Sequence, residues 1–407
     1  MTDKNANKIG YKKTKLGWLP EDWDVVKFSS IFKKINRKNN EGNTNILTIS
    51  ANYGLVSQDK YFNKLVASEN TSNYFLIQNG EFAYNKSYSK NYPMGAIKLL
   101  EKYSKGIVSN LYICFSMNEN LPYKVNFFKF YFDAGCLNKE IYKIAQEGAR
   151  NHGLLNMSTA DFFNTKLAVP KNILEQEKIA EVLSCWDDGI EVLEKLLEKK
   201  QLLKKALMQR LYSRKKTKFD KKIYKLGQIF TNRKETNCTN LELLSVCDGV
   251  GIIPRSQLNA KDNSNEDKSK YLKVCIGDIA YNTMRMWQGR CGVSNYEGIV
   301  SPAYTVCTPT EKINVNYMYY MFKTPHMIHV FWRFSQGIVE DTLNLKFNNF
   351  SIIKVEIPSK EVQQKIAEIL SNCDEEIKLL DKKLELLKQQ KKGLMQKLLT
   401  GEIRVKI

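Results

Sequence analysis

The sequence lacks the cysteine and histidine patterns that define a disulfide-bonded or metal-binding protein. Its nine cysteines form an odd set without a Cys-x-x-Cys pair, which argues against both a disulfide framework and a structural zinc site. Only three histidines occur, and the two nearest one another, His326 and His329, have no second ligand pair nearby. We therefore expect reduced thiols, no bound metal and no cofactor.

Two further absences concern membranes and export. No apolar run approaches the roughly 18 residues that a membrane span needs. The first eight residues, Met-Thr-Asp-Lys-Asn-Ala-Asn-Lys, lack the apolar core of a secretory signal. These features predict a cytoplasmic protein that does not contact a membrane.

The common motifs of nucleotide chemistry and of DNA methylation are also missing. No Gly-x-x-x-x-Gly-Lys-Ser/Thr phosphate loop is present, and Gly249-Val250-Gly251 lacks the third glycine and the helix of a dinucleotide site. The Asn-Pro-Pro-Tyr or Asp-Pro-Pro-Tyr element that holds a flipped adenine is absent too. We expect no catalytic residues. A DNA nuclease with an unrecognised active site stays open as an alternative, because nuclease carboxylates and lysines have little fixed spacing.

The composition is that of a folded protein with a strong positive charge. A chain of 407 residues with 43% apolar residues is long enough for two or three domains with substantial cores. The 63 lysines and arginines exceed the 43 acidic residues and leave a formal net charge of +20. This charge attracts polyanions such as nucleic acid.

An internal repeat organises the chain. The segment from Gln176 to Ser213 aligns without gaps on the segment from Gln363 to Thr400, and about half of the aligned positions are identical. Shorter matches precede both segments in the same order: Gly80–Asn85 with Gly277–Asn282, and Gly106–Ser109 with Gly298–Ser301. The chain therefore consists of two copies of one unit, each a globular domain followed by a long helix.

The globular parts combine strands with helices. Short runs of Tyr, Phe, Ile, Val and Thr, broken by Gly, Asn and Pro, predict strands, whereas residues 123–134 and 315–334 favour helices. The predicted class is α+β, with two similar globular domains and a pair of long helices. The predicted boundaries are 1–168 for the first domain, 169–214 for the central helix, 215–356 for the second domain and 357–407 for the C-terminal helix.

Each repeated segment carries the apolar seam of a coiled coil, with apolar residues at alternating steps of four and three. The seam includes Ile179, Leu183, Ile190, Leu193 and Leu197 in the first helix and Ile366, Leu370, Ile377, Leu380 and Leu384 in the second. A pseudo-twofold pairing of like surfaces makes the helices antiparallel and sends the two domains to opposite ends. Lys200, Lys204 and Lys391 interrupt the seam without an intrinsic reason.

The positive charge is concentrated outside these helices. Residues 171–213 carry equal numbers of acids and bases, and residues 359–400 carry a net charge of +2. Two basic domains joined by nearly neutral helices fit a DNA duplex that is gripped at two places. A lysine-rich surface that only keeps the protein soluble is the simpler alternative, and a coiled-coil scaffold that binds only proteins would need no basic domains.

Polar residues able to read base edges follow the two Ala-Tyr-Asn segments, and a further cluster surrounds residue 150. Arg, Asn and Gln make the bidentate contacts that distinguish guanine or adenine in the major groove. These residues differ between the copies although the flanking residues repeat, as expected for one scaffold with two reading surfaces; variable surface loops are the alternative. The candidates are Asn85, Lys86, Ser87, Tyr88, Lys90, Asn91 and Arg150 in the first copy and Asn282, Arg285, Gln288 and Arg290 in the second.

At this level of detail the chain resembles the specificity subunit of Type I restriction-modification systems. The resemblance rests on the opening Leu16–Trp23, on the two helices that begin Gln-x-Lys-Ile-Ala-Glu after a proline, and on the closing Leu398–Arg404. It implies two target-recognition domains that read the halves of a split DNA site, and paired helices that act as a ruler. It also implies docking of two methyltransferase subunits and recruitment of restriction (translocase) subunits, which supply the chemistry. Lys200, Lys204 and Lys391 would then either face those partners or leave the seam toward solvent.

Overall fold

The computed structural model describes residues 8–50, 54–59, 71–89, 92–147, 153, 155–213, 220–247, 251–258 and 264–407. Contacts divide the chain into two compact units. Unit 1 consists of Met1–Val192 and Leu384–Ile407, and unit 2 consists of Leu193–Lys383. Each unit therefore contains one globular domain and about half of each long helix.

Unit 1 is built around a four-stranded antiparallel sheet in the order β4 (Phe32–Lys34), β11 (Ile113–Met117), β8 (Phe82–Asn85) and β9 (Ala96–Leu99). Antiparallel strand pairs complete its β-structure: β1 (Tyr11–Thr14) with β2 (Gly17–Pro20), β3 (Trp23–Lys27) with β14 (Lys166–Pro170), β5 (Leu47–Ser50) with β6 (Gly54–Ser57), β7 (Phe75–Gln78) with β10 (Lys105–Val108), and β12 (Gln146–Glu147) with β13 (Leu155–Asn156). Its short helices are α1 (Phe28–Ile31), α3 (Val125–Asp133), α4 (Asn138–Ile144) and α5 (Thr159–Phe163).

Unit 2 repeats this arrangement. Its four-stranded sheet runs in the order β16 (Phe230–Arg233), β23 (Tyr304–Pro309), β20 (Ile279–Asn282) and β21 (Cys291–Val293). The strand pairs are β15 (Lys222–Lys225) with β24 (Lys354–Ile357), β17 (Leu244–Cys247) with β18 (Gly251–Pro254), and β19 (Leu272–Val274) with β22 (Gly298–Val300). Its helices are α7 (Val315–Phe322), α8 (Pro325–Phe334) and α9 (Phe347–Ser351), with short 3-10 turns η1 (Leu226–Gln228), η2 (Arg255–Gln257), η3 (Met286–Gln288) and η4 (Glu340–Thr342). The predicted internal repeat and the α+β class are confirmed.

The helical stretch predicted over residues 315–334 is divided into α7 and α8. Thr324 ends the first segment and caps the second, because its hydroxyl accepts a hydrogen bond from the backbone N–H of Met327 at 3.3 Å. Pro325 then occupies the first turn of α8, where its missing N–H has no helical partner to lose.

The repeated glycines have a steric reason in both units. Gly80 and Gly277 adopt φ of +83° and +87° in the turn before β8 and β20, a conformation that other residues rarely adopt. A Cβ at Gly106 would lie 3.0 Å from the carbonyl oxygen of Asn45, and one at Gly298 would lie 2.5 Å from that of Glu242. The short matches found in the sequence are therefore positions that the backbone requires.

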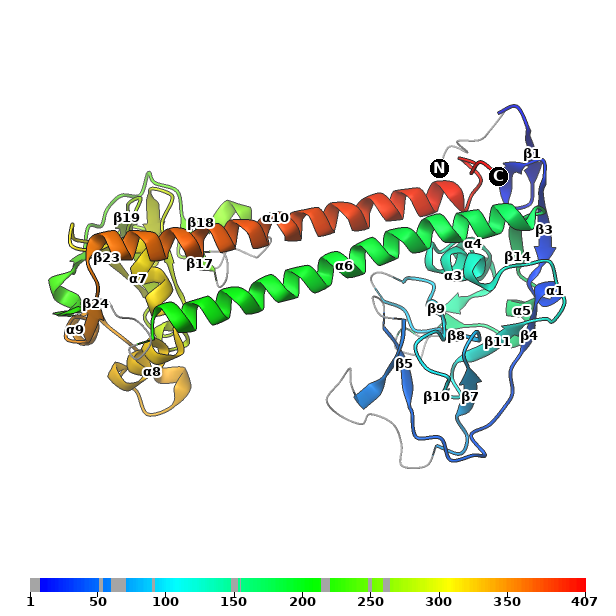
Figure 1. Ribbon diagram of the computed structural model, residues 1–407, viewed down its shortest axis with the longest axis horizontal. Coiled ribbons are helices and arrows are strands. Elements are labelled where there is room, and N and C mark those ends of the chain that lie inside the picture. The colour runs from blue at the N-terminus through cyan, green and yellow to red at the C-terminus, as the bar shows by residue number, and fades with distance from the viewer. Residues whose placement is uncertain are drawn as a thin grey trace. The chain divides into compact units, whose positions relative to one another are not determined.

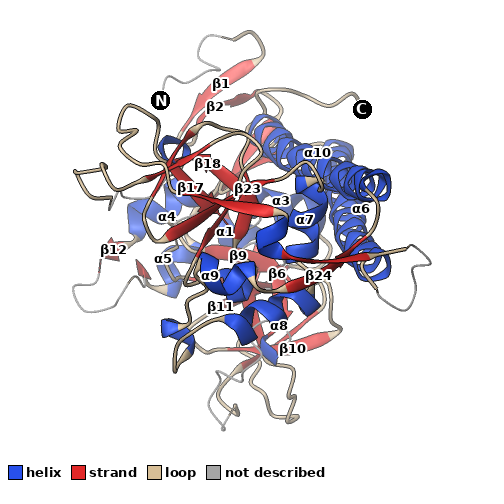
Figure 2. Ribbon diagram, turned by 90° about the vertical axis from the view of Figure 1, so that its left-hand side faces the viewer, coloured by secondary structure: helices blue, strands red, loops and turns tan. Residues whose placement is uncertain are grey.

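A helix lies between the sheet and the long helices in each unit. In unit 1 this helix is α3, whose phenylalanines share one buried cluster with the sheet and with Ile179 and Leu183 of the first long helix (Figure 1). In unit 2 it is α7, whose buried face shares a cluster with Ile366 and Leu370 of the second long helix (Figure 2). The seams of the long helices are thus continuous with the domain cores.

The two long helices are α6 (Ile173–Leu211) and α10 (Lys360–Leu398), of 39 residues each. All ten predicted seam residues are buried or half-buried. As residue numbers rise along α6, those of its ion-pair partners on α10 fall: Asp187 pairs with Lys391 in unit 1, and Lys200 with Glu376 and Lys204 with Asp374 in unit 2. The predicted antiparallel direction is therefore confirmed. None of the described helices is long and apolar enough to cross a membrane.

These ion pairs correct the interpretation of the seam lysines. Lys200, Lys204 and Lys391 do have a reason within the chain, since each meets a carboxylate of the opposite helix. A buried charge needs such a partner. The side chains of Lys204 and Lys391 retain only 22% and 14% of their exposure, so neither simply leaves the seam for solvent.

A glutamine in the first turn of each long helix joins three elements. Gln176 donates from Nε2 to the carbonyl oxygen of Pro170 at 2.9 Å and accepts from the backbone N–H of Lys124 at 3.0 Å. Gln363 makes the same pair of bonds, to the oxygen of Pro358 and from the N–H of Asn314, both at 2.9 Å. Each glutamine is buried and thereby fixes the start of a long helix to the last strand and to α3 or α7.

Candidate DNA interface

An arginine and a carboxylate fix the turn that leads into the central strand of each sheet. In unit 1, Arg37 donates to Glu81 at 2.6 Å, and in unit 2 Arg233 donates from Nε to Asp278 at 2.7 Å. Each carboxylate also accepts the backbone N–H of the residue three positions earlier. The hydrogen bond to Asp278 raises the pKa of Arg233. Strands β8 and β20 therefore start from equivalent, rigid anchors.

An asparagine and a tyrosine fix the other end of the same strands. Asn85 donates to the hydroxyl of Tyr112 at 3.2 Å, and the side chain of Asn282 hydrogen-bonds Tyr304. Each asparagine also accepts, through Oδ1, the backbone N–H two residues later, at 3.0 Å from Ser87 and 2.9 Å from Met284. Both asparagines are half-buried. Their amides therefore already hold the turn from which the candidate reading loops depart.

Sequence reasoning missed the two tyrosines. Tyr112 and Tyr304 each follow the repeated Gly-Ile-Val-Ser segment by three residues, so the repeat itself contained the signal. Burial raises the pKa of both phenols and so favours their neutral, hydrogen-bonding form.

In unit 1 the loop after β8 lies against the hairpin of β12 and β13. The N–H of Tyr88 donates to the carbonyl oxygen of Gly153 at 2.6 Å, and the N–H of Leu155 donates to that of Lys86 at 3.0 Å. Lys86 is half-buried, whereas Ser87 and Tyr88 are exposed. The other three candidates of this copy, Lys90, Asn91 and Arg150, lie outside the described residues.

In unit 2 the loop after β20 forms η3 and lies against the loop that precedes α9. The N–H of Leu345 donates to the carbonyl oxygen of Thr283 at 2.8 Å. Arg285 places Nη1 3.8 Å from a carboxylate oxygen of Asp341, while Gln288 and Arg290 are exposed. The four candidates of this copy lie on one segment of nine consecutive residues, 282–290, which contains the end of β20 and η3.

The two units thus present different loops on the same frame. In both, a loop after the central strand meets a second loop that lies far along the chain. Exposed loops that carry hydrogen-bond donors and acceptors suit the recognition of another molecule's polar surface. In the part of the chain that the structure describes, no group of three or more His, Cys, Asp or Glu residues could hold a metal ion.

Comparison with known proteins finds a family model that matches part of the chain. A family model described as the Type I restriction modification DNA specificity domain matches residues 219–389. This match runs from the start of unit 2 into α10, and the first copy of the repeat has the same fold.

The matches to whole proteins cover nearly the full chain. The putative type I restriction enzyme MjaX specificity subunit of Methanocaldococcus jannaschii is 23% identical, with 97% of both chains covered. The MjaVIII specificity subunit of the same organism is also 23% identical, with 95% of this chain and 94% of the relative covered.

Two solved structures share the fold. The specificity (S) subunit from M. genitalium has a TM-score of 0.56 at 15% identity and covers 98% of this chain and 99% of its own. A chain from a study of complex assembly and conformational transition in the type I R-M system has a TM-score of 0.58 at 13% identity, covering 95% and 99%. Over nearly its whole length the chain is therefore similar to specificity subunits of Type I restriction-modification systems, and residues 219–389 match the specificity-domain model of that family.

Proposed function

We propose that this chain is the DNA-recognition subunit of a multi-subunit restriction-modification enzyme and that it reads a bipartite DNA site. One observation carries the proposal: two copies of the same frame present unlike polar loops at the same place, after β8 and after β20. Two unlike reading surfaces require a site with two unlike halves. The chain directs the chemistry of its partners and has no catalytic role of its own. The proposed function on DNA agrees with the cytoplasmic location predicted from the sequence.

The candidate reading residues make the base contacts, and the lysine-rich surface makes the phosphate contacts. Arg285, Gln288 and Arg290 lie on one loop of unit 2, and Lys86, Ser87 and Tyr88 on the equivalent loop of unit 1. Phosphate contacts supply affinity without sequence preference, whereas contacts to base edges supply the preference. The net charge of +20 supports the first kind of contact, and the divergence of the loops supports the second.

The antiparallel helices act as the ruler between the half-sites. A helix of 39 residues is about 58 Å long at 1.5 Å per residue, against roughly 34 Å for one turn of B-DNA. Reading domains held apart by such helices leave unread base pairs between the two halves of the site.

The outer faces of the helices dock the partner subunits, two methyltransferases that in turn recruit the restriction subunits. Large apolar side chains are exposed on both helices at helical spacing: Val192, Leu196 and Leu203 on α6, and Leu379 and Leu386 on α10. An exposed apolar stripe on a helix is typical of a surface that another protein covers. Val192 and Leu196 are four residues apart, about one helical turn, and Leu379 and Leu386 are seven residues apart, about two turns.

A domain exchange tests the proposal. Residues 1–165 are replaced by the corresponding residues of a relative with another specificity, and methylated adenines are mapped across the genome with the exchanged and the original gene. We expect one half-site to change while the other half and the gap remain. The reciprocal exchange of residues 215–356 serves as the matched control and should change only the other half. A change of both halves by either exchange would refute independent reading domains.

A further inference from the structure

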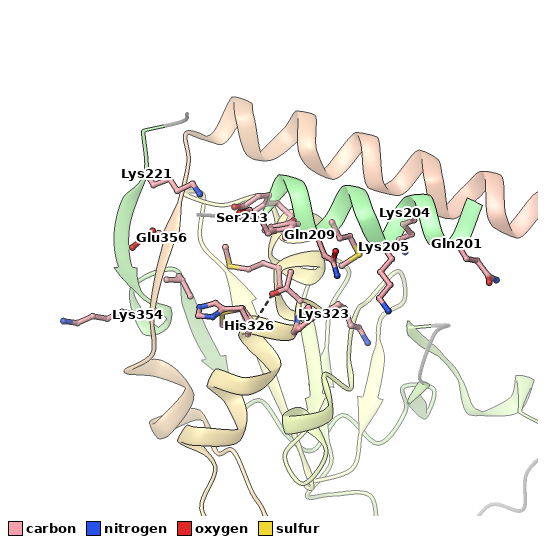
Figure 3. Close-up of a pocket in the computed structure, with 18 residues that line it drawn as sticks. Gln201, Lys204, Lys205, Gln209, Ser213, Lys221, Lys323, His326, Lys354 and Glu356 are labelled. Atoms are coloured by element: carbon pink, nitrogen blue, oxygen red, sulfur yellow. Dashed lines mark hydrogen bonds between the residues drawn. The ribbon is translucent and has the colours of Figure 1, made fainter. Parts of the chain in front are cut away.

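A cavity of about 690 Å³ opens on the surface of unit 2 (Figure 3). It lies between the end of α6, the start of α8 and the strand β24. Its floor is apolar, with Met208 and Tyr212 from α6, Tyr317 and Met321 from α7, and Val355 from β24. The volume falls within the range of roughly 300–1,000 Å³ that is typical of ligand-binding pockets.

The rim of this cavity is basic. Of the described residues that line it, five are lysines and one, Glu356, carries a carboxylate. Lys204 is already paired with Asp374 across the helices, and among the other lysines of the lining Lys205 is exposed and Lys221 is half-buried. Figure 3 shows Lys205 on α6 and Lys221, just before β15, on different sides of the cavity, whereas the side chain of Lys354 extends from β24 away from it. The occupant that suits the cavity is therefore apolar at its tip and negatively charged around it.

The equivalent position in unit 1 shows which side chains fill the space that is a cavity in unit 2. Met395 and Leu399 are the counterparts of Met208 and Tyr212, and both are buried, whereas Met208 and Tyr212 are half-buried. Met395 and Leu399 share a buried cluster with Trp23 and Leu19.

Trp23 has no aromatic counterpart in unit 2. In unit 1, Trp23 pairs with Pro170 across β3 and β14. The register of β15 and β24 makes Lys221 its counterpart. Unit 1 thus supplies its own tryptophan and leucine to this part of the core, whereas unit 2 has a lysine and a cavity.

We propose that this cavity, defined by Met208, Tyr212 and Met321 with the rim lysines Lys205 and Lys221, docks an acidic segment of a partner protein through one large aromatic side chain. The aromatic side chain takes the place that Trp23 fills in unit 1, and carboxylates beside it pair with the lysines. DNA suits the cavity less well, because phosphates would satisfy the lysines and leave the apolar floor uncovered. A second copy of this chain suits it less well too, because it would add +20 of like charge.

Binding of designed peptides to the full chain tests the proposal. The probe is a fluorescein-labelled nonapeptide, Gly-Asp-Glu-Asp-Trp-Glu-Asp-Glu-Gly, followed by fluorescence anisotropy. Two matched peptides replace its tryptophan by alanine or all its acidic residues by lysine. We expect the alanine peptide to bind about tenfold more weakly, because it lacks the apolar anchor. The lysine peptide should not bind.

Variants of the protein assign the binding to the cavity. Met208→Trp fills the cavity and should weaken binding about tenfold. Since that change could disturb the fold, the double variant Lys205→Glu/Lys221→Glu provides a second test on the rim lysines, with a similar loss expected. The control, Lys225→Glu/Lys382→Glu, reverses two exposed lysines of unit 2 outside the cavity and should change affinity less than about twofold.

Three results would overturn the proposal. The first is equal binding of the tryptophan and alanine peptides, and the second is an equal effect of the cavity and control variants. The third is a cavity with another occupant: loss of DNA binding in Lys205→Glu/Lys221→Glu but not in the control assigns it to DNA, and loss of a self-associated form in Met208→Trp assigns it to a second copy. Peptide binding needs no methylation or DNA recognition, so its outcome does not depend on the function proposed above.

Discussion

Arg404 ties the C-terminal end of the chain to the start of α6 in unit 1. Its guanidinium donates to Glu175 at 2.6 and 2.8 Å and to Asp22 at 2.6 and 2.9 Å. Glu175 is only 1% exposed, so Arg404 supplies the partner that this buried carboxylate needs. The hydrogen bond from Arg404 also lowers the pKa of Asp22.

Removal of this cation should destabilise unit 1 strongly. We expect Arg404→Gln to lower the free energy of unfolding by about 3–5 kcal/mol, because it leaves Glu175 buried without its counter-charge. Urea unfolding measures the change. Arg210→Gln, at an exposed position on the last turn of α6, is the control and should cost less than about 0.5 kcal/mol. Equal losses of unfolding free energy in the two variants would show that the contacts of Arg404 with Glu175 and Asp22 do not stabilise the fold.

The same pair predicts a pH dependence. Because the folded-state pKa of Asp22 lies below the ordinary value of 3.8, its contribution to stability is present above that pH. The contribution is lost as the pH falls from 3.8 through the lower folded-state value. The advantage of the wild type over Arg404→Gln should therefore shrink below about pH 4. An advantage that stays constant down to pH 2 would contradict this assignment.

Two residues of the second reading loop should respond differently to truncation. Arg290 is exposed, so Arg290→Ala should leave thermal stability nearly unchanged and relax preference at one base pair, by about 1–3 kcal/mol if it reads a base. Asn282→Ala should instead lower stability by about 1–2 kcal/mol, because Tyr304 and the turn lose their hydrogen bonds. Thermal unfolding and binding to single-base variants of the DNA site separate the two effects. Equal weakening by Arg290→Ala on every sequence would identify a phosphate contact instead.

At the scale of the helices, the seam ion pairs form an equivalent pair of contacts in the two units. Lys391 meets Asp187 in unit 1, with its ammonium 5.2 Å from the centre of the Phe130 ring. Lys204 meets Asp374 in unit 2, with its ammonium 5.2 Å from the centre of the ring of Tyr320. A polar pair in an apolar seam favours the one register in which the two charges meet.

A charge exchange tests this role. Lys204→Asp should lower the free energy of unfolding by about 2–3 kcal/mol, between the losses typical of exposed and of fully buried pairs. Adding Asp374→Lys should restore more than half of the loss, since the pair is then present in reverse. A double-mutant cycle by thermal unfolding measures the coupling. Additive losses would show that the pair does not specify the register.

The sequence predicted the helices well because their signal is periodic and local. It could not assign partners to the seam lysines, because Lys204 and Asp374 lie 170 residues apart and meet only in one antiparallel register. The convergence of the loop after β8 with Gly153 and Leu155 was hidden for the same reason. The break between α7 and α8 was readable from Thr324 and Pro325, a cap and a helix-starting proline that a search for apolar periodicity overlooks.

The candidate reading residues were predictable only in part. The repeat located the loops, because the frame repeats while the loops diverge. It did not show that the side chains of Asn85 and Asn282 are already hydrogen-bonded to tyrosines. A repeated asparagine can hold a turn or read a base equally well. Whether the exposed residues of these loops contact bases stays a prediction.

At the scale of the whole molecule, the proposed ruler makes the helix length a determinant of DNA specificity. One heptad inserted after Lys195 and one after Lys382, equivalent positions of the repeat, preserve the seam pattern of α6 and α10. Each helix then gains about 10.5 Å, the length of roughly three base pairs. A heptad in α6 alone serves as the control and should destabilise the protein, because the two seams then no longer match.

The most direct measurement is a genome-wide map of methylated adenines made with the gene for the double insertion and with the original gene. We expect both half-sites to keep their sequences and the unread gap between them to grow by about three base pairs. An unchanged gap, with methylation retained, would contradict the proposal that the paired helices set the distance between the two reading domains.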